Sequence, residues 1–488
     1  MDYERAPLRL FKVLFAVVLL LLLAKGTADP DLWGHLRFGQ DIVAAAQIPR
    51  ADTYSFTSDR PWVNHEWLAE VLMATAYERL GRPGLFLLCI LIAVASVWVL
   101  SATLGASQLG EPVRVGLLLS AFLGSALQFV TIRPQLFSVL VFAVLLWLLG
   151  RVERRRPREV VWLPALFACW SNLHGGWIVG LGVVLLWAAS VAVRRTVPWR
   201  WAVSAPALAA LGSLANPFGL RLWTFMWETV GVGRAEIEDW APLWHVPLAT
   251  PWWLMTVAVL VLAWRRRGDA SFFVFLPAAV LALLSLKVVR VEPYFAMTTA
   301  AMLAPLFVGQ GPARFPLSRM PTRKELIVLS LLVTVGVSAA AVAAAKNVNC
   351  LRLDVEKRMT PEVEAVEFMK LNHLRGKLLT WFDYGEYAIW HLSPALKVSY
   401  DGRRETVYSA AVQRAHMNFY FNERDARYAD DVNADYVWIP NSLRVVRALE
   451  RAGWVAIFRG SKSVIYSRHT GLYVQPASVV GQRCFPGP

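Results

Sequence analysis

Long apolar runs separated by short polar connections occupy most of the first 345 residues. Each run is either long enough to cross a bilayer as a helix or short enough to need an irregular neighbour. The pattern predicts a polytopic α-helical membrane protein with about eleven transmembrane helices. The runs lie near residues 13–24, 84–104, 114–132, 136–150, 160–172, 176–193, 201–215, 252–264, 271–286, 294–309 and 325–345.

The first run follows Arg5, Arg9 and Lys12 and has no small-residue cleavage site after it. It therefore favours a retained first span over a signal peptide.

Basic residues fall in every second connection, which predicts the orientation of the chain. By the positive-inside rule these connections and the N-terminus are cytoplasmic, and an odd number of spans places the C-terminus outside. The residues are Arg114, Arg151, Arg154, Arg155, Arg156, Arg158, Arg194, Arg195, Arg200, Arg265, Arg266, Arg267, Arg314, Arg319, Arg323 and Lys324.

Composition agrees with this class. Hydrophobic residues make up 56% of the 488 positions, and the mean hydropathy is +0.44, which is too apolar for a soluble enzyme. The net charge of +15 is mainly a topology signal, because the arginines lie at membrane ends and do not form a patch with interleaved aromatic residues. We therefore expect no nucleic-acid partner.

Beyond residue 345 the apolar runs give way to an alternating α/β pattern. We interpret 1–345 as a transmembrane module that includes a first outer loop, 29–83, and 346–488 as an extracytoplasmic α/β domain. The expected helices are 361–374, 409–428 and 441–452, and the expected strands are Lys377–Thr380, Leu396–Tyr400, Tyr436–Ile439, Trp454–Arg459 and Ser463–Tyr466.

Four cysteines divide between two settings. Cys89 and Cys169 lie within predicted spans, whereas Cys350 and Cys484 bracket the predicted outer domain. In an oxidising compartment the second pair can form a disulfide, and two buried thiols are the alternative.

The first outer loop carries the most informative residues. Asp29, Asp31 and His35 follow the first span closely, where ionisable side chains are costly and favour a functional explanation. Two amphipathic patterns, Leu32–Ile48 and Trp67–Leu80, predict helices in the plane of the interface.

Later outward loops add further polar residues on the same side of the membrane. This asymmetry is stronger evidence for a site than any single motif. The residues are Arg133, Gln135, Asn172, His174, Asn216, Glu236, Glu238, Asp239, Lys287, Arg290 and Glu292.

Four segments, 29–37, 60–70, 172–175 and 401–403, resemble a widespread group of bacterial GT-C-like proteins. The loop, the apolar bundle and the outer domain also resemble the GT-C class of membrane glycosyltransferases, which includes oligosaccharyltransferases, protein mannosyltransferases and the aminoarabinose transferase of lipid A. The chain departs from that pattern after the third span, where Arg133-Pro134-Gln135 stands in place of a second acidic motif.

The resemblance implies a multi-pass enzyme of the bacterial inner (plasma) membrane that acts in the cell envelope. It implies inverting transfer of a sugar from a polyprenyl-phosphate donor to a glycan, lipid or protein acceptor on the outer face. Asp31, with Asp29 as the alternate, is the catalytic carboxylate in this reading.

The remaining candidates are assigned to substrate binding. Arg133, Lys287 and Arg290 suit the donor phosphate, because guanidinium groups match its oxygens in pairs. His35, His65 and His174, with Glu66, could hold a divalent metal or orient the acceptor, although no tight spacing defines a ligand set and no cofactor is established. Gln135 and Asn172 complete the set.

Structural explanations compete with these assignments. Asp29 and Asp31 could begin an interfacial helix, as could His65 and Glu66. Arg133 could anchor a helix at the interface. Asn172 and Asn216 could satisfy broken helix ends, and Trp381–Tyr387 and Asp401–Arg403 suit strand-to-helix turns.

Two other functions stay open. A lipid or glycan transporter or flippase would also be polytopic, although no internal repeat or midspan charge favours one. A non-catalytic membrane assembly protein would use the loop and the outer domain only to bind a partner. No phosphate-binding loop, dinucleotide fingerprint or nucleophile elbow is present in the sequence.

Overall fold

The computed structural model describes residues 27–107, 109–125, 128, 129, 131–154, 156–230, 240–245, 250–265, 267, 270–307, 323–353, 361–421, 426–476 and 484–487, with five positions between 13 and 21. The chain divides into two compact units. The helical unit comprises Met1–Gly26 and Phe86–Asn347, and the sheet unit comprises Thr27–Leu85 and Val348–Pro488.

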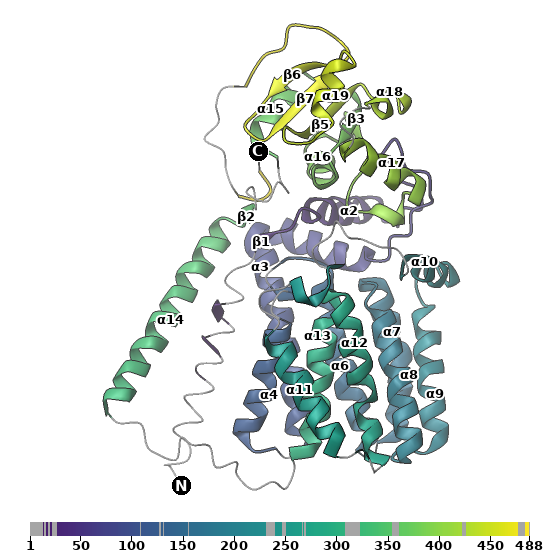
Figure 1. Cartoon of the computed structure of the whole chain (residues 1–488), viewed down its shortest axis with the longest axis vertical. Helices are drawn as coiled ribbons and strands as arrows, with labels where there is room; N and C mark the ends of the chain where they lie inside the picture. The colour runs from purple at the N-terminus through teal and green to yellow at the C-terminus, as the bar shows by residue number, and fades with distance from the viewer. Residues whose placement is uncertain are drawn as a thin grey trace. The chain divides into compact units, whose positions relative to one another are not determined.

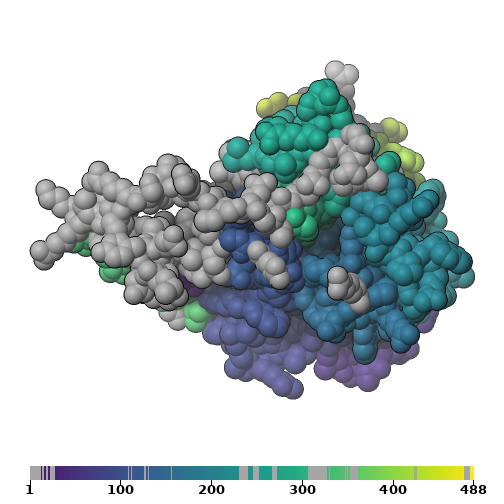
Figure 2. Space-filling model, turned by 90° about the horizontal axis from the view of Figure 1, so that it is seen from below, coloured from purple at the N-terminus to yellow at the C-terminus, as the bar shows by residue number. Residues whose placement is uncertain are grey.

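Most helices of the helical unit run side by side as a bundle (Figure 1), and Figure 2 shows the surface of this unit from below in blue, teal and green. Proline at the first or second position starts α7, α12 and α13, where the missing N–H costs no hydrogen bond. The helices are α4 (Glu111–Gly124), α6 (Gln135–Glu153), α7 (Leu163–Leu173), α8 (Trp177–Arg194), α9 (Trp199–Ser213), α10 (Leu220–Val230), α11 (Thr250–Arg265), α12 (Leu276–Lys287), α13 (Glu292–Leu303) and α14 (Arg323–Asn349).

Among the residues that the structure describes, three helices are long and apolar enough to cross a membrane: α3 (Trp67–Gly105), α6 and α8. Shorter apolar helices occupy Val113–Gly124, Trp252–Arg265, Phe272–Lys287 and Ser330–Lys346. The described helices overlap the predicted apolar runs, whereas most of the run 13–24 lies outside the described residues. The number of spans, about eleven, stays a prediction, as do the side of the membrane and the domain bounds 1–345 and 346–488.

The sheet unit contains a five-stranded mixed sheet in the order β4-β3-β5-β7-β6. The pairs β3–β4 and β3–β5 are parallel, and β5–β7 and β6–β7 are antiparallel. Every predicted strand of this region is present, which confirms the α/β pattern. The elements are α15 (Val363–Leu371), β3 (Gly376–Thr380), α16 (Gly385–Leu392), β4 (Leu396–Val398), α17 (Ala410–Phe421), α18 (Arg427–Asp431), β5 (Tyr436–Pro440), α19 (Val446–Arg451), β6 (Val455–Arg459) and β7 (Ser463–Ser467).

The first outer loop is part of the sheet unit. Its strand β1 (Thr27–Ala28) pairs in parallel with β2 (Arg352–Leu353). Residues 54–56 extend the edge of β4, because Val398 N–H donates to the Tyr54 carbonyl and Phe56 N–H donates to the Val398 carbonyl, both at 3.0 Å. The loop is thus bound by backbone hydrogen bonds to strands more than 300 residues away.

The two predicted amphipathic helices are present, with corrected ends. The first, α2 (Leu32–Ala45), stops three residues earlier than expected because Ala46 adopts a left-handed conformation, with φ of 49°. The second begins at Trp67 as expected and meets the following span at Gly81, whose φ of 62° kinks α3.

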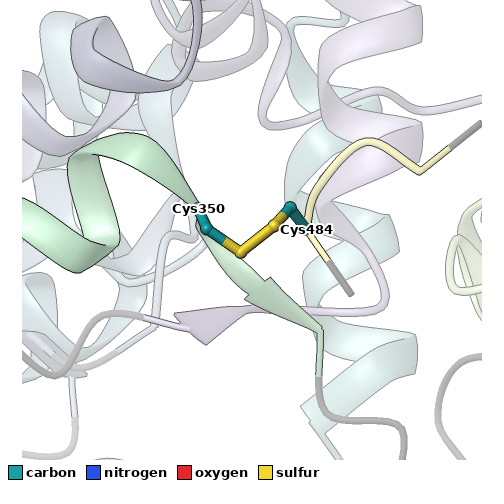
Figure 3. Close-up of a disulfide and its surroundings, with 2 residues drawn as sticks. All are labelled: Cys350 and Cys484. Atoms are coloured by element: carbon teal, nitrogen blue, oxygen red, sulfur yellow. A yellow bond between two sulfur atoms is a disulfide. The ribbon is translucent and has the colours of Figure 1, made fainter. Parts of the chain in front are cut away.

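Cys350 and Cys484 form a disulfide, which confirms that prediction (Figure 3); their Cα atoms lie 4.9 Å apart. The residues after Cys484 form a short hook. Phe485 is fully buried against Trp33, with ring centroids 4.9 Å apart. The Trp33 indole N–H also donates to the Pro486 carbonyl at 2.8 Å. The hook therefore packs directly on α2.

Candidate functional site

The predicted site residues fall into two groups, one in each unit. The sheet unit holds Asp29, Asp31, His35, His65 and Glu66, whereas the helical unit holds Arg133, Gln135, Asn172, His174, Lys287 and Arg290. The convergence of both groups on one cavity stays a prediction.

Asp29 and Asp31 shape the start of α2. Asp29 is 3% exposed, and its Oδ1 accepts a hydrogen bond from the Asp31 backbone N–H at 3.0 Å. The Asp31 backbone carbonyl accepts the His35 N–H at 3.0 Å, whereas the Asp31 side chain does not cap the helix. Helix initiation thus explains part of the role of Asp29 but does not account for the Asp31 carboxylate.

His35 lies one turn after Asp31 and is held by Glu70 of α3. Its Nδ1 is 3.3 Å from Glu70 Oε1, and Glu70 Oε2 accepts a hydrogen bond from Asn64 Nδ2 at 2.6 Å. Burial disfavours the charged ring, but the hydrogen bond to Glu70 and the negative charges of Glu66, Glu70 and Asp31 outweigh it and raise the pKa of His35 to about 9. His35 is therefore an imidazolium at neutral pH.

Two further carboxyl groups come from the turn and helix after β3. Burial, with the nearby charges of Asp31 and Asp29, raises the pKa of Asp383 to about 7. Burial, with the charges of Asp31 and Asp401, raises the pKa of Glu386 well above its usual range. We call Asp29, Asp31, Asp383 and Glu386 the acidic cluster. It joins the first outer loop to the α16 region around one group of carboxyls.

Arg403 forms a buried ionic network beside this cluster. Its guanidinium donates to Asp52 at 2.6 Å and to Asp401 at 2.7 Å. Burial opposes the charges, but the pairing holds the pKa of Asp401 below and that of Arg403 well above their usual values. Three aromatic rings from the first outer loop surround the cation: Phe38, Tyr54 and Trp62, with centroids 5.0, 5.3 and 4.8 Å away.

The segments 60–70 and 401–403, both singled out in the sequence, therefore contact each other. We call Arg403, Asp52, Asp401 and the three rings the arginine cage. Its members are satisfied by one another, so the cage holds the loop on the sheet unit, as expected of a structural turn.

His65 and Glu66 lie at the start of α3. His65 Nε2 is 3.6 Å from Glu66 Oε1, and the Asn64 side-chain oxygen accepts the Glu66 N–H at 3.2 Å. Asn64 therefore holds the turn just before the helix. The location agrees with a helix start, and binding of a substrate by either residue stays a prediction.

In the helical unit, Gln135 and Arg290 contact each other. With the Gln135 amide oriented to satisfy both of its polar atoms, its oxygen accepts hydrogen bonds from the Arg290 guanidinium, one of them 3.3 Å from Nε. The guanidinium also lies 5.8 Å from the centroid of the Trp240 ring. Arg290 is in a 3-10 turn, Val289–Val291, between α12 and α13. The arrangement presents a fixed cation at a junction of two helices.

His174 lies just after α7. Its Nδ1 accepts the Gly176 N–H at 3.0 Å and lies 2.7 Å from the Ser138 hydroxyl. The Trp170 indole in turn donates to Ser138 at 2.7 Å. Ser138 was not a candidate in the sequence, because a serine within an apolar run has no distinctive pattern.

Three other predicted residues mark helix ends. Asn172 Nδ2 donates to the carbonyls of Ala168 and Ala215 at 2.7 and 2.8 Å, as expected of a residue that satisfies a broken helix end. The Arg133 carbonyl accepts a hydrogen bond at the start of α6. Lys287 is the last residue of α12. Contacts of these side chains with a substrate stay a prediction.

Within the part of the chain that the structure describes, no group of three or more His, Cys, Asp or Glu side chains is arranged to hold a metal ion. His35 and His65 belong to the sheet unit and His174 to the helical unit. Binding of a divalent metal by these histidines was one of the alternatives predicted from the sequence, and it stays untested.

The sheet unit brings together groups that are able to perform acid–base chemistry. A carboxylate can accept a proton, a neighbouring imidazolium can stabilise negative charge, and both are supported by buried partners. Sequence reasoning did not select Glu70, Asp383 or Glu386. Glu70 lies within the motif 60–70, and Asp383 and Glu386 lie within Trp381–Tyr387. Their membership of these two motifs was the indication that the sequence offered for them.

No protein-family model and no curated protein matches this sequence. Solved structures do match. The archaeal oligosaccharyltransferase AglB from Archaeoglobus fulgidus, in complex with an inhibitory peptide and a dolichol-phosphate, matches with a TM-score of 0.58 and 11% identity over 90% of this chain and 69% of that one. ArnT from Cupriavidus metallidurans, bound to undecaprenyl phosphate, matches with a TM-score of 0.50 and 12% identity over 95% and 98%. At such identities the likeness is one of fold.

Proposed function

We propose that this chain, which has the GT-C-like fold of those membrane glycosyltransferases, moves a sugar from a polyprenyl-phosphate donor to an acceptor with inversion. The observation that carries the proposal is the placement of the Asp31 carboxylate one helical turn from the charged His35. The lipid carriers named for both similar structures support the donor class.

Asp31 is the proposed base. It takes the proton of the acceptor hydroxyl or amide while the acceptor atom forms a bond to the anomeric carbon and the bond from that carbon to the phosphate oxygen breaks. Asp29, the alternate, holds the turn through its hydrogen bond to the Asp31 N–H. His35, kept charged by Glu70, stabilises the negative charge that develops nearby.

The departing polyprenyl phosphate needs cations of its own. Arg290 is the first candidate, because Gln135 and Trp240 fix the orientation of its guanidinium. Arg133 and Lys287 are the additional candidates. His174 and Asn172 belong to the same unit and are proposed to line the substrate path.

The proposal includes the inner (plasma) membrane implied by the resemblance, and the orientation inferred from the arginine pattern, with a cytoplasmic N-terminus and the sheet unit outside. The acceptor is a glycan, a lipid or a protein on that face. A reporter enzyme that works only in the cytoplasm can be fused after residue 488. Activity of this fusion would contradict the proposed orientation.

The test is turnover of a polyprenyl-linked sugar by the purified protein in lipid nanodiscs. Asp31→Asn should lower the rate by a factor of about 10²–10⁴, the usual contribution of a positioned base. Arg290→Gln and Arg133→Gln should weaken donor binding as well as slow transfer. Asp430→Asn is the matched control, because that carboxylate is 44% exposed and paired with Arg468.

Near-normal rates in both Asp31→Asn and Asp29→Asn would refute the carboxylate role and restore the helix-start explanation. Transbilayer movement of a lipid-linked sugar without its consumption would favour the transporter. Binding of a protein partner with neither activity would favour the assembly protein.

A further inference from the structure

Glu386 is a deeply buried carboxyl of the acidic cluster and is incompletely satisfied. It is 3% exposed, and within the described structure its Oε2 has no hydrogen-bond partner. The charged groups that act on it are Asp31, Asp401, Glu70 and Arg403. Three of these four are acidic, and the one cation is already bound in the arginine cage.

The side chains of Glu386 and Asp31 both lie against Gly402. A Cβ added to Gly402 would overlap the carboxylates of both residues, with Glu386 Oε1 only 2.7 Å away. A Cβ added to Gly34, in α2, would overlap the other Glu386 oxygen. Glycine at these two positions therefore leaves room for the two carboxyls, of which Glu386 is buried and Asp31 is partly exposed.

Ionising both carboxyls of such a pair is unfavourable, and the buried Glu386 is less solvated than the partly exposed Asp31. An unpartnered oxygen such as Glu386 Oε2 costs less on a neutral carboxyl than on a carboxylate, and the neutral form has an O–H to donate from Oε1. Asp31 interacts with the charged His35 one turn along its own helix, whereas the cation that acts on Glu386, Arg403, is bound in the arginine cage. Glu386 is thus the member that keeps the proton.

We propose that Glu386 is a protonated carboxyl that donates a hydrogen bond to Asp31 and thereby positions the proposed base. Its catalytic part rests on the proposed function, but the protonation and the pairing do not. Burial and the surrounding acidic side chains, which raise the pKa of Glu386 well above its usual range, agree with this assignment.

The first experiment needs no activity. Infrared difference spectra of the purified protein at neutral pH, wild type against Glu386→Gln, should contain the C=O stretch of one protonated carboxyl that the variant lacks. That band should shift in Asp31→Asn, because its hydrogen-bond partner changes from an anion to an amide. Glu364→Gln, a partly exposed glutamate of the same unit, should leave the spectrum unchanged. Absence of the band, or a band insensitive to Asp31→Asn, overturns the proposal.

The second experiment compares two substitutions of similar volume in the transfer assay. Glu386→Gln keeps a hydrogen-bond donor and should stay within about threefold of wild type, whereas Glu386→Met has no donor and should lower kcat about tenfold to hundredfold. In the Met variant the acid limb of the pH–rate profile should also move to higher pH, because Asp31 loses a donor that stabilises its ionised form.

Equal losses in the Gln and Met variants would overturn the proposal, because an ionised Glu386 would then be required. If Asp31→Asn retains transfer while the infrared band behaves as expected, the pairing stands and the catalytic role of Asp31 fails. The two proposals can therefore be refuted separately.

Discussion

Replacing Arg403 by methionine tests whether the arginine cage holds the first outer loop on the sheet unit. Methionine keeps an unbranched stem but has no charge, so it leaves Asp52 and Asp401 facing each other without a cation. Their side chains are 1% and 0% exposed, and that of Arg403 is 5% exposed. Water therefore cannot replace the lost partner.

Breaking a buried ion pair by removing one partner costs about 3–5 kcal/mol. For a unit of about this size, each kcal/mol lowers the melting temperature by roughly 2–4 °C, so we expect a fall of about 6–20 °C. The matched control is Arg468→Met. Arg468 also pairs with a carboxylate, Asp430, and lies 4.8 Å from the centroid of the Trp454 ring, but its side chain is 36% exposed. An exposed pair contributes about 0–1 kcal/mol, which predicts a fall of at most about 4 °C.

The assay is thermal unfolding of the purified full chain in detergent, followed by tryptophan fluorescence and compared as apparent midpoints. Adding Asp401→Asn to Arg403→Met should restore part of the lost melting temperature, because it removes one of the two uncompensated charges. Because the pKa of Asp401 is lowered in the folded protein, its contribution is present above the unfolded value and disappears as pH falls through the folded one. Equal shifts for Arg403→Met and Arg468→Met at neutral pH would refute the reasoning.

Three further predictions concern the same unit. Gly402→Ala should displace the two carboxylates beside it, cost about 1–3 kcal/mol of stability and lower the rate of transfer about 10²-fold. The control Gly471→Ala, where a Cβ meets only atoms at 3.7 Å or more, should change neither stability nor rate. Equal behaviour of the two variants would contradict the crowding of carboxylates at Gly402. Replacing Cys350 and Cys484 by serine should lower the free energy of unfolding by about 5 kcal/mol, because the disulfide closes a loop of 134 residues. Free labelling of both thiols in the folded wild type would argue against the disulfide. His35, with its pKa raised to about 9, should stabilise the protein fully below about pH 6.5 and lose this contribution as pH rises through 9. The difference in melting temperature between wild type and His35→Gln should therefore shrink over that range. A constant difference would disprove the raised pKa of His35.

Local sequence patterns predicted much of the fold. The apolar runs matched the described helices, and alternation predicted the strands of the sheet unit, because burial of one face or of a whole span leaves a periodic record. The end of α2 was wrong by three residues. Its termination depends on the backbone conformation of Ala46, and alanine has no special preference for a left-handed conformation.

The site was predictable only in part. Asp31 and His35 are four residues apart, so their placement on adjacent turns follows from helix geometry. The ion pair of Arg403 with Asp52 joins residues 351 positions apart, and no local rule indicates such a contact. Glu386 was assigned to a turn because its motif also suits one, and only tertiary packing brings it beside Asp31.

The hook after Cys484 has a consequence for the order in which the protein matures. Trp33 and the carbonyl it binds are separated by 453 positions. At about 5–20 residues per second, ribosomes need roughly 20–90 s to make that stretch. During this interval the first outer loop exists without Phe485 and Pro486, which contact Trp33. Asp383 and Glu386, which complete the acidic cluster, are also made after the helices between them and Asp31. The cluster can therefore assemble only late in synthesis, and the C-terminal contact of Trp33 comes last.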